Sequence, residues 1–409
     1  MKKLCTALLA LAVLLAALPG AMAEEKTELL FKHLWNGDQA VWLEEKIDQF
    51  NQSQDQIVVR TEYVPFDDMN TQIAIDIASG GIADLYAINN PEHASYVDMG
   101  LLADITDYLA GWEDMEQFYE RSVASCQVDG RLYGLPAFDT NCLALFYNKT
   151  VLEEKGIAVP ATMEELYAAC QAVTDPSIGR YGLAMSAIDA EDGTFQFIPF
   201  LYAFGGDVYD VDSEASVAAL EYLVDMIENG YMSREVINFK QGDVLTRWLA
   251  GQAVFMINGS WNLNSIRTTY DPELDWEWSV ALIPAGEQGQ SFSCMGGKNI
   301  GVGATDNVAQ AVEFLKYISS QEVMLEFATQ FGAVPNRADV AADSYWESDH
   351  EAKVFVEQMD SAVPRGPHKD WAEISQAIRT ATGSAMSGNS TAAQALAVAA
   401  QTIDGILQG

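Results

Sequence analysis

Apolar positions in the first hundred residues alternate between strand and helix spacing. The expected order is strand, helix, strand, helix, strand, at residues 29–34, 43–50, 57–64, 69–78 and 83–88. Strands that alternate with helices favour a parallel, doubly wound sheet, which binds ligands beyond the carboxyl ends of its strands. The polar and aromatic residues at those ends are Trp35, Asn36 and Asp38 after the first strand and Asn89 and Asn90 after the third.

The pattern then indicates that the chain crosses into a second unit. Asp129-Gly130 is a tight-turn signal, and Pro136 prevents a helix from starting before the apolar run 143–147. An extended crossing between two units is how a hinge is built, because a few residues at the ends of elements absorb the rotation. The aromatic and hydrogen-bonding residues of this gap, which we expect to face the ligand, include Phe138, Asp139 and Asn141.

The second unit repeats the mixture of helices and strands. Thr162 and Glu165 form a capping-box pattern at a helix start, residues 215–227 are amphipathic, and residues 253–257 read as a buried strand. The tail after Thr380 predicts a pair of helices. We therefore predict an α/β fold of two units, or lobes, joined by crossing segments that act as hinges. The predicted lobes are residues 24–138 with 282–332, and residues 139–281 with 333–409.

The N-terminus has the features of a secretion signal. Lys2 and Lys3 precede the apolar run 8–18, and the small residues before position 24 predict cleavage after Ala23. The apolar run is too short to cross a bilayer, which needs about 20 residues. Cys5 precedes the apolar run instead of following it, so nothing supports a lipid anchor. We expect an exported protein, periplasmic or extracellular.

Composition narrows the partners. A chain of 409 residues with 49% hydrophobic residues can bury two cores. Its formal charge is −37, and such a field repels nucleic acid, so we do not expect that partner. We also expect a monomer. Four cysteines remain after export, and they allow three pairings, although buried thiols are the favoured reading. They are Cys126, Cys142, Cys170 and Cys294.

Several motifs, taken in their order, resemble the extracellular solute-binding proteins, family 1, of bacterial ABC importers. The motifs are residues 35–38, 130–136, 147–149, 160–166, 204–206, 253–261, 296–303 and 332–335. The resemblance spans nearly the whole mature chain. It implies two α/β lobes that close over a carbohydrate, most simply an oligosaccharide, and present it to a membrane permease. It implies no cofactor, no metal and no catalysis.

Site residues follow partly from this resemblance. Trp261 stands where maltodextrin-binding members stack a tryptophan on sugar, directly after Ser260, although packing in the lobe core is the alternative. Asp38 matches an acidic sugar ligand, or else caps the following helix. Those members carry a second tryptophan four residues before an arginine on a C-terminal helix. When Arg379 is aligned with that arginine, Ser375 takes the place of the tryptophan, and Trp371 lies one turn earlier. That departure weakens the case for a maltodextrin.

Other candidates have two readings each. Trp35 suits either the ligand wall or the sheet core. Asn89 and Asn90 suit either ligand contact or capping of the loop before Pro91. Gly296, with Asn299 close behind it, indicates either a turn or a close approach of the backbone to the ligand.

An exported enzyme such as a glycoside hydrolase is the main rival, because it too would combine aromatic residues with paired carboxylates. The chain contains no G-x-S-x-G, no H-E-x-x-H and no phosphate loop. An iron carrier would need clustered tyrosines, and no Tyr-Tyr pair occurs. The sequence therefore favours a binding protein.

Overall fold

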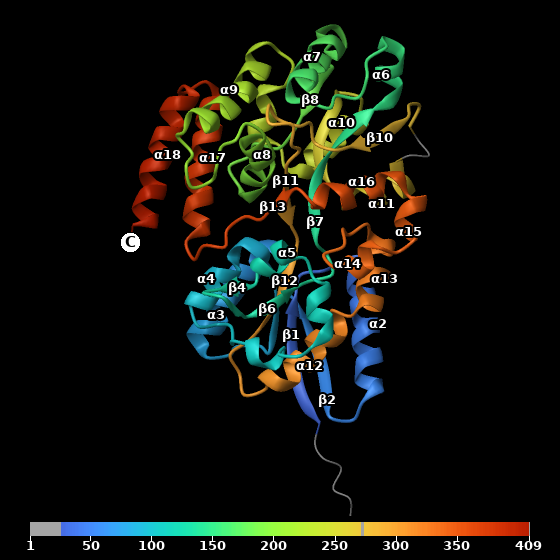
Figure 1. The fold of residues 1–409 in the computed structure, drawn as a ribbon, viewed down its shortest axis with the longest axis vertical. Coiled ribbons are helices and arrows are strands. Elements are labelled where there is room, and N and C mark those ends of the chain that lie inside the picture. Colours follow the sequence, from blue (N-terminus) through green and yellow to red (C-terminus); the bar gives the residue numbers. More distant parts are fainter. Residues whose placement is uncertain (1–25, 271–273, 409) are drawn as a thin grey trace, which may run out of the picture.

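The computed structural model describes residues 26–270 and 274–408, and these form two α/β lobes, each built around one sheet (Figure 1). The predicted signal peptide and its cleavage site lie outside the described residues. The two-lobe α/β architecture is confirmed. Among the described residues, no helix has both the length and the apolar character needed to cross a bilayer.

The first lobe contains a five-stranded sheet of order β2-β1-β3-β12-β6. Strand β1 pairs in parallel with β2 and β3, whereas β12 runs antiparallel to β3 and β6. The strands are β1 (Thr27–His33), β2 (Ile57–Tyr63), β3 (Leu85–Asn89), β6 (Gly134–Pro136) and β12 (Lys298–Val302). The helices are α2 (Gly37–Ser53), α3 (Met69–Ser79), α4 (His93–Asp98), α5 (Glu120–Ala124), α12 (Val308–Ile318), α13 (Gln321–Phe331) and α14 (Ala338–Ala341).

The second lobe has the order β13-β11-β7-β9-β8, with β10 also paired to β7. Its strands are β7 (Asn141–Asn148), β8 (Tyr181–Ala184), β9 (Ala253–Gly259), β10 (Trp278–Ala281), β11 (Ser293–Gly296) and β13 (Ala362–Val363). Its helices are α6 (Lys149–Lys155), α7 (Met163–Val173), α8 (Glu191–Ala203), α9 (Glu214–Glu228), α10 (Gln241–Leu249), α11 (Asn262–Ser265), α15 (Tyr345–Ser348), α16 (His350–Met359), α17 (Trp371–Ser387) and α18 (Ala392–Leu407).

Local signals read from the sequence explain several element ends. Asp129 and Gly130 both have positive φ, 51° and 74°, and join strands β4 (Gln127–Val128) and β5 (Arg131–Leu132) as a tight hairpin. The Thr162 hydroxyl accepts a hydrogen bond from the Glu165 backbone N–H, so the predicted cap of α7 is confirmed. The Glu165 carboxylate accepts from the Ala161 N–H, one residue before the position that a standard capping box uses.

Three crossings join the lobes. The first runs from β6 to β7, and the second passes through Gly297 between β11 and β12. The third follows α14, because Arg337 donates to Ser319 O and to Asp114, both in the first lobe. Asn336, which precedes α14 in the first lobe, holds the first crossing by donating to Ala137 O and to the Thr140 hydroxyl.

The second crossing comes later than predicted. We expected the chain to return to the first lobe at residue 282, but β10 and β11 both pair with β7. The chain therefore stays in the second lobe up to Gly296. The physical reason is that short apolar runs do not show which sheet they complete, since an edge strand of either sheet has the same composition. The third crossing is likewise later than residue 333.

Candidate functional site

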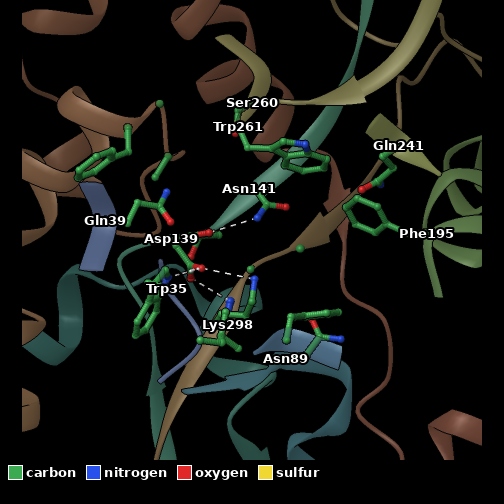
Figure 2. A pocket seen from close by; sticks show the side chains of 18 of the residues that line it. Trp35, Gln39, Asn89, Asp139, Asn141, Phe195, Gln241, Ser260, Trp261 and Lys298 are labelled. Atoms are coloured by element: carbon green, nitrogen blue, oxygen red, sulfur yellow. Dashed lines mark hydrogen bonds and ion pairs between the residues drawn. The ribbon is translucent and has the colours of Figure 1, made fainter. Parts of the chain in front are cut away.

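A cavity of about 310 Å³ lies between the lobes, where the crossings meet (Figure 2). Both lobes line it. The first lobe contributes Leu34, Trp35, Asn36, Gln39, Phe66, Asn89, Lys298, Phe327, Phe331, Gly332 and Ala333. The first two crossings and the second lobe contribute Asp139, Thr140, Asn141, Glu191, Asp192, Phe195, Gln241, Ser260, Trp261, Gly296, Gly297 and Arg365. The structure thus brings together eight of the residues predicted from sequence: Trp35, Asn36, Asn89, Asp139, Asn141, Ser260, Trp261 and Gly296.

Asp139 organises the floor of this cavity. Its carboxylate accepts hydrogen bonds from Trp35 Nε1 at 2.9 Å and from the Lys298 backbone N–H at 3.1 Å, and Lys298 Nζ lies 3.4 Å away. The Asn141 side chain donates to the Asp139 carbonyl at 3.2 Å. Figure 2 shows these bonds converging on Asp139. The carboxylate therefore fixes the first crossing relative to the end of β1 and the start of β12.

Two glycines permit the close approach of the crossings. A Cβ on Gly296 would lie 2.3 Å from Asn141 Oδ1, and one on Gly297 would lie 2.8 Å from Thr140 Cα. Gly297 also has a φ of +112°, which L side chains rarely adopt. Gly296 therefore lies close to the neighbouring crossing, and its approach to a ligand stays a prediction.

The second lobe supplies an aromatic surface. Trp261 follows β9 at the start of α11, and its ring lies so close to Gly259 that a Cβ there would be 1.8 Å from it. The Phe195 ring lies 6.2 Å away, inclined by 31°. Figure 2 shows Trp261 and Phe195 together on one side of the cavity, opposite Trp35, Asn89 and Lys298. A half-buried indole beside a second ring is a suitable platform for the C–H face of a sugar.

Several polar atoms around the cavity have no hydrogen-bond partner among the described residues. They are the Ser260 hydroxyl, Gln241 Nε2 and Arg365 Nε. Buried polar groups are nearly always paired, and an unpaired one costs about 1–3 kcal/mol. All three atoms are shielded from solvent, so each becomes paired only if a ligand oxygen or an ordered water comes within hydrogen-bond distance.

A charged group at the start of α8 was not predicted from the sequence. Glu191 accepts hydrogen bonds from Arg365 at 2.8 Å and from Trp371 Nε1 at 3.0 Å. Burial raises the pKa of the neighbouring Asp192 carboxyl, although a backbone hydrogen bond from Gln241 opposes that shift. The one available signal was the acidic pair directly before the aromatic run that begins at Phe195.

Two residues carried over by resemblance lie elsewhere. Asp38 is exposed in the first turn of α2 and makes no side-chain cap, since Asn36 is the N-cap residue. Arg379 donates to Asp189 at 3.0 Å on the outside of α17. Neither residue lines the cavity, because Asp38 and Arg379 lie on the faces of α2 and α17 that point away from it.

Four further predicted residues lie behind the cavity wall. Phe138 packs 4.6 Å from the Trp35 ring, Asn299 bonds to Ser125, and Asn90 accepts from Arg365. Trp371 is only 2% exposed and is bonded to Glu191, so it does not replace the second tryptophan of maltodextrin-binding proteins. These side chains support residues of the wall. Trp35 is 2% exposed and also lines the cavity, so it belongs to the core, while its contact with a ligand stays a prediction.

The cysteines agree with the favoured reading. All four cysteines within residues 26–270 and 274–408 are buried free thiols, and burial raises the pKa of each. Register explains why neighbours do not pair: Cys142 lies opposite Met295, so Cys294 projects from the other face of the sheet. Within the described ranges, no cluster of three or more His, Cys, Asp or Glu side chains could hold a metal ion.

Known proteins resemble this chain over most of its length. A binding protein of Brucella abortus (strain 2308) is 24% identical over 368 residues, 86% of each chain. The maltotriose-binding protein of Pyrococcus abyssi is 24% identical over 328 residues, which are 76% of this chain and 68% of that protein.

Solved structures share the fold. The cyclic alpha-maltosyl-1,6-maltose binding protein from Arthrobacter globiformis has a TM-score of 0.83 at 22% identity, covering 94% of this chain and 99% of that one. An ABC transporter solute-binding protein from Thermotoga lettingae TMO, bound with alpha-D-tagatose, has a TM-score of 0.80 at 24% identity, covering 93% and 100%. The family profile described as bacterial extracellular solute-binding protein matches residues 45–354. This chain belongs to the family of bacterial extracellular solute-binding proteins.

Proposed function

We propose that this protein captures a carbohydrate between its lobes and delivers it to the permease of an ABC importer. The observation that supports the proposal most directly is the composition of the cavity. It combines the Trp261 and Phe195 rings with unpartnered hydroxyl, amide and guanidinium groups. A sugar offers the matching surfaces, namely apolar C–H faces and a ring of hydroxyls.

The size of the cavity favours a short saccharide. A volume of about 310 Å³ lies at the lower end of the roughly 300–1,000 Å³ that is typical of small-molecule pockets. The relatives named above bind maltotriose, a cyclic maltose derivative and tagatose, so both short and longer sugars occur among similar proteins. The burial of Trp371 also argues against a long maltodextrin here.

Capture works through closure. The ligand contacts both lobes only when they meet, so it favours the closed state by its difference in affinity for the two states. The site residues predicted from sequence that line the cavity would make these contacts. The protein acts as a monomer, exported with cleavage after Ala23, and takes no nucleic acid as partner. The relatives are named as binding proteins, and none supports the hydrolase alternative.

A thermal-shift screen tests this function. The purified mature protein is melted with glucose, maltose, maltotriose, tagatose and xylose. A sugar present at 100 times its Kd should add about 2.7 kcal/mol of stability and raise the Tm by several degrees. Chromatography of the same mixtures should recover the sugar intact. Cleavage of the sugar would favour the hydrolase instead, and a flat response to a broad glycan panel would refute carbohydrate capture.

A further inference from the structure

The Arg365 guanidinium connects the two lobes beside the cavity. One terminal nitrogen donates to Glu191 Oε1 of the second lobe at 2.8 Å, and the other donates to Asn90 Oδ1 of the first lobe at 3.2 Å. Arg365 is 6% exposed and Asn90 is 5% exposed. Both ends of this bridge are therefore shielded from water, where a hydrogen bond to a charged group is worth most.

Residues of the second lobe hold Arg365 in place. Its guanidinium lies 4.6 Å from the centre of the Phe195 ring. Glu191, which accepts from Arg365, also accepts from Trp371 Nε1 and from the Ser375 hydroxyl. The carboxylate is thus fixed by two groups of α17. Since Phe195 and Glu191 belong to α8, Arg365 moves with the second lobe.

Asn90 belongs to the first lobe. It follows β3, and its backbone N–H donates to Gly297 O. Figure 1 shows the segment between β13 and α17, which carries Arg365, passing between the lobes. The hydrogen bond from Arg365 to Asn90 therefore joins two bodies, and separating the lobes breaks it.

Arg365 also borders the ligand space. It lines the cavity, and its Nε has no hydrogen-bond partner among the described residues. The three donor positions of one guanidinium thus have three different roles: one faces Glu191, one faces Asn90, and one remains for an acceptor oxygen.

We propose that Arg365 is the positioning residue that couples ligand capture to lobe closure, holding the first lobe through Asn90 and offering Nε to a hydroxyl or carbonyl oxygen of the ligand. This inference rests on the proposed closure over a carbohydrate. Arginine is required because its planar fork reaches two fixed acceptors at once, whereas the single ammonium of lysine does not.

Interlobe distances test the bridge without any ligand. Cysteines replace Ile75 on α3 and Ile178 in the second lobe, which are 54% and 61% exposed, and both receive spin labels. The four native thiols are buried and stay unlabelled in the folded protein. Double electron–electron resonance then measures the fraction of molecules with the short, closed distance.

Three variants are compared in this labelled background. Asn90→Ala and Arg365→Lys should each lower the closed fraction about five- to tenfold without sugar, the effect of losing one charge-assisted hydrogen bond. Arg234→Gln is the matched control, because Arg234 donates to Met386 O entirely within the second lobe. It should leave the closed fraction unchanged. Equal distance distributions in wild type and Asn90→Ala would overturn the proposal.

Calorimetry with maltotriose as the probe separates this inference from the proposed function. If wild type binds maltotriose, Arg365→Lys should weaken binding more than Asn90→Ala does, because it loses both the bridge and the Nε donor. Equal losses in the two variants would overturn the ligand-facing role of Nε. If wild type binds no maltotriose, the choice of sugar fails, while the distance measurements still decide the bridge.

Discussion

Replacing Trp261 with alanine should weaken ligand binding by about 2 kcal/mol, roughly thirtyfold in Kd. The half-buried indole already packs against the lobe, so a ligand covers only its free part. About a quarter of a tryptophan's area is roughly 50 Å², worth about 1.3 kcal/mol at 25 cal/mol per Å². Stacking geometry adds about 0.5–1.5 kcal/mol. A fully exposed tryptophan would lose more binding free energy on replacement, because the ligand would cover more of its surface.

Isothermal titration of both proteins with the sugar found in the screen measures this loss. Trp112→Ala is the control, because Trp112 is also half-buried against the core but does not line the cavity. Melting curves show whether either variant has lost stability. The reasoning is refuted if Trp261→Ala binds within twofold of wild type, or if Trp112→Ala loses as much affinity.

Three further outcomes are expected. His93 is fully buried without a hydrogen-bond partner among the described residues, and burial lowers its pKa from 6.5 to about 3. Below pH 6.5 this histidine is protonated in the unfolded chain, whereas in the folded chain it stays neutral down to about pH 3. The stability of the fold therefore decreases as the pH falls from 6.5 to 3. Between pH 6.5 and pH 5, the free energy of unfolding measured in urea should fall by about 1.5–2 kcal/mol less in His93→Leu than in wild type. An unchanged pH profile would contradict this. Gly297→Ala should destabilise the fold by about 1–3 kcal/mol in the same assay because of its φ and its contact with Thr140, while Gly242→Ala, which has open space, should not. A thiol reagent should react slowly with the native protein, because Cys126, Cys142, Cys170 and Cys294 are buried. After unfolding it should detect four thiols, and fewer than four would indicate a disulfide.

Hydrophobic periodicity predicted the alternation of strands and amphipathic helices, and the family resemblance predicted that they form two lobes. Turn and capping residues predicted the hairpin at Asp129 and the cap at Thr162, where the chemistry is local. The second crossing was misplaced, because pairing of β10 and β11 with β7 is a long-range choice that short strands do not reveal.

The candidate site divides in the same way. Trp261, Asp139 and Asn89 follow strands or crossings, so the topology alone brings them to the cavity. Glu191 and Arg365 were missed, because they meet only through packing between a helix start and a loop 174 residues later. Arg379 was predicted from a sequence alignment with the family motif. Such an alignment does not show which face of the helix carries the residue.

Strand β12 occupies an interior position of the first sheet, between β3 and β6, although it lies far later in the chain than either. The ribosome must therefore pass residue 302 before the N-terminal half can finish its own sheet. Until then β3 and β6 have no partner between them, and the emerging polypeptide lacks a stable early domain. In an exported protein, a sheet that closes only after residue 302 postpones folding of the N-terminal half until most of the chain has been made.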